Sequence, residues 1–206
     1  MNNINFSIIQ PDDWHIHLRE GSITELVIKD TYITFGRALV MPNLEKPILN
    51  VDQAEKYRNF LMDLIPKNYN FSPIMTLYLN ENISADDIVR ISTSKNLGGI
   101  KFYPKGVTTN SSKGVSDHRN YFHIFKLMEK FNVALQIHGE VNDKNIDEFD
   151  REKIFVDTVL SEIIKEFPQL RIVLEHITTK HAVEFIKQCK FNIGATITPH
   201  HLLYER

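Results

Sequence analysis

Residues 13–21 read DWHIHLREG. They begin an alternation of strand-length apolar runs with helix-like segments, which is typical of a parallel sheet covered by helices on both faces. An open sheet that binds a dinucleotide has a G-x-G-x-x-G turn after its first strand. Here that turn, at 17–21, contains a single glycine, and the motif occurs nowhere in the chain. The stretch therefore favours a β/α barrel, whose active site collects residues from the ends of many strands.

The first strand, expected at Asp13–Leu18, is followed by six more apolar runs of strand length. They lie at Arg37–Met41, Pro73–Leu79, Gly99–Tyr103, Val133–Ile137, Arg171–Ile177 and Phe191–Ile197. No linker or low-complexity segment divides them, so we expect one domain over residues 1–206. The fold class is α/β, a β/α (TIM-type) barrel with about seven of its eight strands present.

Helix signals occupy the segments between the strands. Ser22-Ile23-Thr24-Glu25 reads as a capping box at the start of a helix. The apolar residues that follow it are Leu26, Ile28 and Ile33. Stripes with helical spacing are predicted at Ala54, Tyr57, Leu61 and Leu64; at Tyr121, Phe125, Met128 and Phe131; and at Phe155, Val159 and Ile163.

The composition excludes several classes of partner. The formal charge of −2, from 24 Lys+Arg against 26 Asp+Glu, gives no electrostatic case for nucleic acid or an anionic membrane. A lone Cys189 cannot form an intramolecular disulfide, and we find no membrane-spanning apolar run and no signal peptide. These features predict a cytoplasmic protein that acts on a small molecule.

Candidate metal ligands begin in the first strand. His15 and His17 stand two residues apart, so their side chains project to the same face and can bind one zinc ion. Arg19 follows at the same period and would place a cationic anchor on that wall. Two hydrogen-bonded histidines without a metal remain the alternative.

Further candidates end later strands. A buried lysine can lose its proton, and a neutral Lys101 amine can react with carbon dioxide to give a carbamate that bridges two metals. His138 and His176 end strands in successive β/α units. The plain alternatives are a lysine that reaches solvent and two isolated buried histidines.

Several polar residues stay without an assigned role. Glu140 and Glu175 are either partners that orient imidazoles or solvated side chains. Lys105–Gly114, rich in Gly, Thr and Ser, suits a mobile lid as well as an ordinary loop. We expect surface positions for His118, His123 and His181 and a packed position for Cys189. His200 and His201 follow the last strand and so point toward the active-site end of a barrel, but the sequence fixes no role for them.

In this order the residues resemble the amidohydrolase superfamily, specifically the class II bacterial dihydroorotases. The resemblance is carried by PDDWHIHLRE, GRALVMPN, KFYPKGVTTNSSKGV, IHGEV, FDRE, EHITTK and ATITPHHL, from about Pro11 onward. It implies an eight-stranded barrel with two zinc ions at the carboxyl ends of its strands. It also implies the reversible cyclisation of N-carbamoyl-L-aspartate to L-dihydroorotate in pyrimidine biosynthesis, carried out by a homodimer.

Residue by residue, the resemblance implies that His15 and His17 bind the first zinc, that carbamylated Lys101 bridges both, and that His138 and His176 bind the second. The substrate is implied to contact Arg19, Asn43 and His138, with Thr108 and Thr109 in a loop that closes over it. The family's catalytic aspartate follows an eighth strand, beyond Arg206. We therefore expect this chain to be the N-terminal part of such an enzyme and to be inactive alone.

Two other functions stay open. A hydantoinase or allantoinase would share the metal ligands but not the carboxylate-binding pair, so Arg19 with Asn43 argues against it. A non-catalytic barrel homologue that serves as a binding subunit is favoured by the missing aspartate, but the retained metal ligands oppose it.

Overall fold

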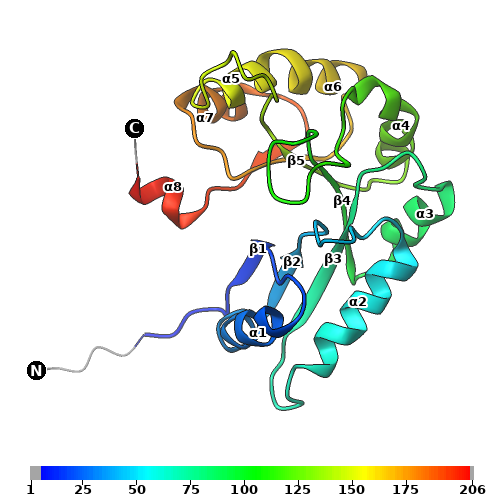
Figure 1. Cartoon of the computed structure of the whole chain (residues 1–206), viewed down its shortest axis with the longest axis vertical. Helices are drawn as coiled ribbons and strands as arrows, with labels where there is room; N and C mark the ends of the chain where they lie inside the picture. Colours follow the sequence, from blue (N-terminus) through cyan, green and yellow to red (C-terminus); the bar gives the residue numbers. More distant parts are fainter. Residues whose placement is uncertain (1–5, 205–206) are drawn as a thin grey trace, which may run out of the picture.

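Seven parallel strands form a single sheet in chain order in the computed structural model, which describes residues 6–204 (Figure 1). The strands are β1 (Asp12–Ile16), β2 (Arg37–Val40), β3 (Ser72–Tyr78), β4 (Leu97–Phe102), β5 (Leu135–His138), β6 (Ile172–Glu175) and β7 (Ile193–Ala195). The helices are α1 (Ser22–Thr34), α2 (Val51–Asp63), α3 (Ala85–Thr93), the 3₁₀ turn η1 (His118–Tyr121), α4 (Phe122–Lys130), α5 (Arg151–Phe155), the π-helical turn η2 (Val156–Leu160), α6 (Ser161–Glu166), α7 (Lys180–Gln188) and α8 (Pro199–Leu203).

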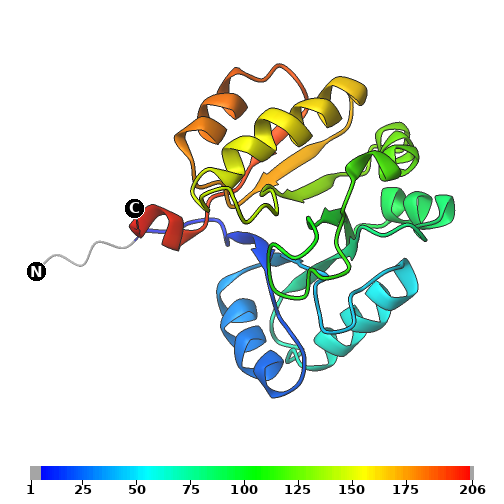
Figure 2. The ribbon, with the colours of Figure 1, turned by 45° about the horizontal axis from the view of Figure 1, so that its top comes forward.

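The sheet curls, and helices lie around its outside (Figure 2). Each strand pairs with the next one along the chain, so within residues 6–204 the sheet has two edges, β1 and β7. The predicted β/α architecture and all seven strands are confirmed. The first strand is shorter than expected, because β1 ends at Ile16 rather than Leu18.

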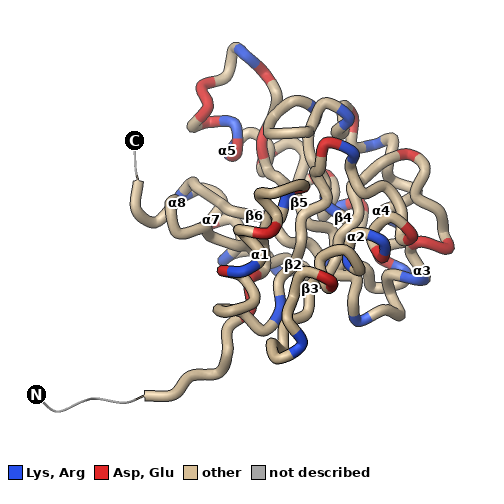
Figure 3. The backbone as a smooth tube through the Cα atoms, turned by 60° about the horizontal axis from the view of Figure 1, so that its bottom comes forward, with Lys and Arg blue, Asp and Glu red and all other residues tan. Residues whose placement is uncertain are grey.

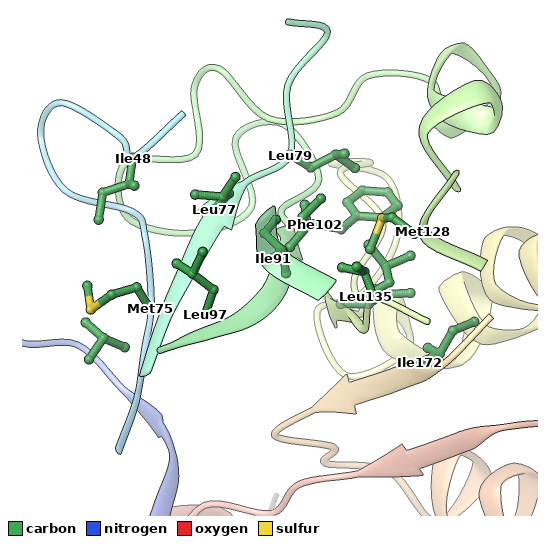
Figure 4. Packing of buried hydrophobic residues seen from close by; sticks show 14 of the residues in the cluster. Ile48, Met75, Leu77, Leu79, Ile91, Leu97, Phe102, Met128, Leu135 and Ile172 are labelled. Atoms are coloured by element: carbon green, nitrogen blue, oxygen red, sulfur yellow. The ribbon is translucent and has the colours of Figure 1, made fainter. Parts of the chain in front are cut away.

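Apolar side chains from the strands and the surrounding helices make the main core. Leu77, Leu135 and Met128 are fully buried and pack in one cluster with Phe102 and Ile172 (Figure 4). Burying each such side chain stabilises the fold by about 1.5–3 kcal/mol. This packing fixes the strands, and with them the direction of the side chains at their carboxyl ends.

Buried polar residues stand among the strands as well. Lys101 pairs in register with Tyr78 on one side and Gln136 on the other, and His138 pairs with Glu175. Paired residues of parallel strands point to the same face of the sheet. Polar groups from β3 to β6 are therefore brought together inside the curl.

The start of α1 differs from the prediction. Gly21, with φ 69°, takes the N-cap position, and no side chain caps the helix. Arg19, with φ 58°, is also left-handed, so the chain turns out of β1 before Ser22 is reached. The capping box is found instead at α3, where Ser84 and Asp87 bond reciprocally to each other's backbone N–H.

Of the three apolar residues expected to follow the start of α1, only one is buried. Ile28 is buried, but Leu26 is 72% exposed and Ile33 is 49% exposed. The helix packs through Thr24, Ile28, Thr31 and Tyr32, because it covers the edge of the sheet and meets the core on one side. The predicted apolar stripes do pack on the core; their residues are Ala54, Tyr57, Leu61, Leu64, Tyr121, Phe125, Met128, Phe131, Phe155, Val159 and Ile163.

Acidic and basic residues are interspersed along the chain (Figure 3). Neither sign occupies a continuous face in that view, as the small net charge predicts. Within residues 6–204, no helix combines the length and the apolarity that a membrane crossing requires.

Candidate functional site

The histidines at the strand ends line one cavity of about 380 Å³. Its wall is formed by His15, His17, Tyr103, Thr108, His138, Glu140, His176, Thr178, Thr198, His200 and His201. These residues lie at the ends of β1 and β5 or follow β1, β4, β5, β6 and β7, so the carboxyl ends of five strands build the site. This is the end at which β/α barrels place their active sites.

His15 and His17 face one another as their two-residue spacing predicts. Their Nε2 atoms lie 3.2 Å apart. Two nitrogens bound tetrahedrally to one zinc at 2.0–2.1 Å would stand about 3.3 Å apart. The pair therefore already has the separation that a shared metal ion requires.

Glu175 fixes the orientation of His15. Its Oε2 atom accepts from His15 Nδ1 at 3.0 Å and from Thr196 Oγ1 at 2.6 Å. A proton held on Nδ1 leaves the lone pair of Nε2 directed at the cavity, which is how carboxylates orient metal-binding histidines. Of the two roles left open for Glu175, the buried partner is the one observed, since the residue is only 1% exposed.

His176 joins the cluster through an unusual backbone conformation. It directly follows β6 with φ 42°, and its N–H donates to Thr196 Oγ1 at 2.7 Å. Its ring centroid lies 5.0 Å from that of His15 and 4.6 Å from that of His138. A non-glycine residue in the left-handed region is strained, and such strain gathers at functional sites. His176 therefore links the β1 histidines to the β5 histidine.

Lys101 is completely buried beneath these rings. Its Nζ atom has no hydrogen-bond partner and lies 5.4 Å from the centroid of the Tyr103 ring. Burial lowers the pKa of Lys101 to about 8. The neutral amine that carbamate formation requires is therefore much more accessible near neutral pH than in an exposed lysine.

Three of the histidines, His15, His17 and His176, are also held in the neutral form that binds metals. Burial lowers the pKa of His17 to about 3, with His15 and Arg19 adding repulsion. Burial likewise lowers the pKa values of His15 and His176. Although burial raises the pKa of Glu175, the nearby Lys101 and His15 outweigh it and leave that pKa below its usual value. Neutral imidazoles beside a charged carboxylate suit a cation site.

The two candidate carboxylate-binding residues lie beside this cluster. Arg19 has a buried Nη1 atom without a hydrogen-bond partner. Because Arg19 is left-handed, it does not continue the alternation of β1 as predicted. Asn43 is 2% exposed; its Nδ2 donates to Thr109 O at 3.0 Å, while its buried Oδ1 has no partner. Both residues offer unused polar atoms.

The loop at Lys105–Gly114 borders the cavity. Thr108 lines the cavity, and Thr109 is exposed while its carbonyl accepts the bond from Asn43. Both alternatives for this loop, a mobile lid and an ordinary solvated loop, are compatible with one residue at the cavity wall, so the lid stays a prediction.

Three histidines were expected on helical surfaces, and one of these predictions is wrong. His118 is 8% exposed, because it lies in η1 under α6 and its Nε2 pairs with Glu162 Oε2 at 3.0 Å. His123 is exposed. His181 is partly exposed and pairs with Asp157. Cys189 is half-buried at the end of α7.

Other site residues escaped the sequence analysis. Tyr103 lies two residues after Lys101, so the same period-2 rule that joined the histidines would have found it. His200 and His201 reach the cavity wall, with His201 Nδ1 2.7 Å from Thr198 Oγ1. Glu152 accepts from the backbone of Thr178 and Thr179, which holds the loop after His176, and no local signal indicates this.

The imidazole nitrogens and the lysine amine of this site are chemically suited to a metal site, and His15 and His17 have the spacing of two ligands of one ion. In the described part of the chain, however, no group of three His, Cys, Asp or Glu side chains stands in metal-binding geometry. Three buried atoms, Lys101 Nζ, His17 Nδ1 and His138 Nε2, have no hydrogen-bond partner, although Glu140 Oε2 lies 3.7 Å from His138 Nε2. The hydrogen-bonding groups of the site are thus not fully satisfied within the described residues.

The chain is similar to curated proteins named dihydroorotase. It is 48% identical over 200 residues to the one from Acaryochloris marina, and 48% identical over 199 residues to the one from Hahella chejuensis. Both alignments cover 97% of this chain and 58% of the relative. The chain thus spans little more than half the length of the relatives it matches. A comparison with protein-family models gives no match.

Solved structures give the same result. A dihydroorotase from Campylobacter jejuni superposes with a TM-score of 0.85 at 36% identity, over 95% of this chain and 56% of that one. A Saccharomyces cerevisiae dihydroorotase in complex with 5-fluoroorotic acid superposes with a TM-score of 0.81 at 35% identity, over 94% and 57%. An L-hydantoinase from Arthrobacter aurescens, at 14% identity and TM-score 0.73 over 95% and 48%, shares the fold.

Proposed function

We propose that this chain, a homologue of dihydroorotases over 97% of its length, carries the metal centre and the carboxylate-binding groups of a dihydroorotase. The reaction would be the reversible cyclisation of N-carbamoyl-L-aspartate to L-dihydroorotate in pyrimidine biosynthesis. The observation that carries the proposal is the gathering of four histidines around one cavity above a buried lysine whose amine has no partner.

Two zinc ions would be held by this donor set, with His15 and His17 on the first and His138 and His176 on the second. The neutral amine of Lys101 would attack carbon dioxide, forming a C–N bond and releasing a proton, and the resulting carbamate offers an oxygen to each ion. When bound, zinc supplies a polarised substrate carbonyl and a bound water whose pKa is lowered to about 7. Glu175 keeps the His15 lone pair directed at the cavity throughout.

The substrate carboxylate would meet Arg19 and Asn43. A guanidinium can donate two parallel hydrogen bonds to a carboxylate, and Arg19 Nη1 is free to do so. The yeast protein was solved with 5-fluoroorotic acid, which is itself a carboxylate-bearing pyrimidine. His138 would contact the substrate as well, and the loop bearing Thr108 and Thr109 would close over it.

We further propose that residues 1–206 belong to one domain of a cytoplasmic enzyme. The enzyme would act as a homodimer, and its partner would be a small-molecule substrate rather than a nucleic acid or a membrane. Carbamylation of Lys101, the zinc ions and the dimer are parts of this proposal.

The test is an assay of the whole protein with N-carbamoyl-L-aspartate and, separately, with hydantoin. We expect ring closure of the first, little action on the second, and two zinc-type ions per subunit by elemental analysis. Arg19→Lys keeps the charge but loses the two-pronged geometry, so it should weaken substrate binding by about 1–3 kcal/mol with unchanged metal content. A whole protein that prefers hydantoin, or a fully active Arg19→Lys, would favour a hydantoinase.

Glu175→Gln should lower metal affinity without unfolding the protein. Glutamine keeps the size of the side chain but presents an uncharged amide to His15, so the preference for a proton on Nδ1 weakens. Loss of such an orienting partner costs about 10- to 100-fold in metal affinity or activity. Titration with a competing chelator measures the affinity, and Glu166→Gln on the surface of α6 serves as the control. Equal affinities in both variants would remove the orienting role.

A further inference from the structure

Residues 105–114 form a compact turn rather than an extended loop. The Ser111 side chain is 1% exposed and bonds to the backbone of Thr108 in both directions, accepting from its N–H and donating to its carbonyl. Gly106 N donates to Ser111 O at 3.0 Å. Because these contacts are internal, the turn would move as one unit.

The base of the turn is anchored by backbone bonds. Lys105 N donates to Val115 O at 3.0 Å, and Val115 N donates to Tyr103 O at 2.8 Å. Asn142, in the segment after β5, donates from its amide to Lys105 O at 2.6 Å. The base is thereby fixed to β4 and β5, and any hinge must act beyond it.

The tip of the turn is held to the segment after β2 by a reciprocal pair of bonds. Asn110 Nδ2 donates to Asn43 O at 3.0 Å, and Asn43 Nδ2 donates to Thr109 O at 3.0 Å. Asn110 has φ 56°, a left-handed conformation that asparagine tolerates better than most residues. That conformation places its amide beside the segment after β2, which is 67 residues away in sequence.

The bond to Thr109 fixes the orientation of the Asn43 side-chain amide. The carbonyl of Thr109 accepts only from a donor, so it selects the orientation in which Nδ2 faces the turn. The second hydrogen on Nδ2 is then left for another acceptor, and the buried Oδ1 has no partner in the described structure. When the turn leaves, the amide loses the contact that fixes this orientation.

We propose that Asn110 is a positioning residue that latches the turn onto Asn43, and that the latch couples loop closure to the presentation of the Asn43 amide to a substrate carboxylate. The coupling rests on the proposed function, whereas the latch does not. Because coupling between two events is reciprocal, a bound carboxylate also stabilises the closed turn.

The test compares Asn110→Asp with wild type in the whole protein. Aspartate keeps the size and the tolerance for a left-handed backbone, but its carboxylate cannot donate to Asn43 O. Asn132→Asp is the matched control, because Asn132 also has φ 56° but follows α4 at the other end of the strands. Asn110→Gly, which keeps the backbone conformation and removes the side chain, should behave as Asn110→Asp does.

Hydrogen exchange of amides 105–114 without ligand reports the latch. We expect about fivefold faster exchange in Asn110→Asp and Asn110→Gly, the effect of losing one net hydrogen bond, and no change in Asn132→Asp. The dissociation constant for 5-fluoroorotate should rise by a similar factor, with KM raised more than kcat is lowered.

If amides 105–114 of the Asn110 variants exchange at the wild-type rate, the latch is rejected. Faster exchange with unchanged 5-fluoroorotate binding and KM overturns the coupling. An inactive wild-type protein whose turn is still released by Asn110→Asp rejects the proposed function and leaves the latch standing, so the two failures are distinguishable.

Discussion

Replacing Lys101 with methionine is expected to abolish ring closure while making the metal-free protein more stable. Methionine fills a similar volume but cannot form a carbamate, so the two ions of the proposed metal centre would lose their shared ligand. A catalytic metal ion lowers the activation free energy of such a reaction by several kcal/mol, and about 1.36 kcal/mol corresponds to a tenfold change in rate. We therefore expect turnover to fall by about 10³-fold or more, together with a loss of bound metal.

The gain in stability has a separate cause. The buried Nζ atom of Lys101 has no hydrogen-bond partner, so nothing offsets the free-energy cost of removing its charge from water. Because the pKa of Lys101 is about 8 in the folded protein and 10.5 in an exposed lysine, the unfolded chain binds more protons between those pH values. The stability of the metal-free wild type must then rise as pH increases from about 8 to 10.5, and the rise should be absent from Lys101→Met.

Chemical denaturation of both proteins across this pH range, in the presence of a chelator, measures the difference. Lys126→Met on the exposed face of α4 is the control, and it should follow the wild-type profile. A Lys101→Met protein that retains activity, or that is less stable than wild type at pH 7, would contradict the assignment of Lys101 as a buried reactive amine.

The sequence predicted those features that depend on local period. All seven strands were found, because each is a short apolar run bounded by polar residues. Lys101, His138 and His176 were singled out because they stand where such runs end, and parallel strands bring their carboxyl ends to one edge of the sheet. The gathering of these residues at one cavity was therefore predictable without knowing any contact.

Features that depend on distant partners were not predictable. Glu175 could be read as buried or solvated until His15, 160 residues away, was seen to donate to it. His118 was expected on the surface because nothing near it in sequence indicates Glu162. The left-handed Arg19 ended the alternation of β1 early, since the chain must turn there to begin α1.

The second large effect concerns residues 1–206 expressed alone. We expect this polypeptide to associate and to lack dihydroorotase turnover, in contrast to a protein extended to the length of its relatives. Within the described chain, β1 and β7 each have one neighbour, and unpaired strand edges invite pairing with another molecule. Apolar residues stand exposed on this side of the fold, at 50% for Ile197, 74% for Leu202 and 77% for Leu203.

The expected loss of turnover rests on the proposed function and on the 58% of the relatives' length that this chain spans. The resemblance places the catalytic aspartate after an eighth strand, and a positioned general base contributes about 10²–10⁴-fold. Sedimentation measures the association of both polypeptides, and a ring-closure assay measures their turnover. The two effects are therefore tested separately. A monodisperse, fully active 206-residue protein would mean that a residue already at the cavity supplies the base. His201 would then be the first to replace, since it lines the cavity with its Nδ1 held by Thr198.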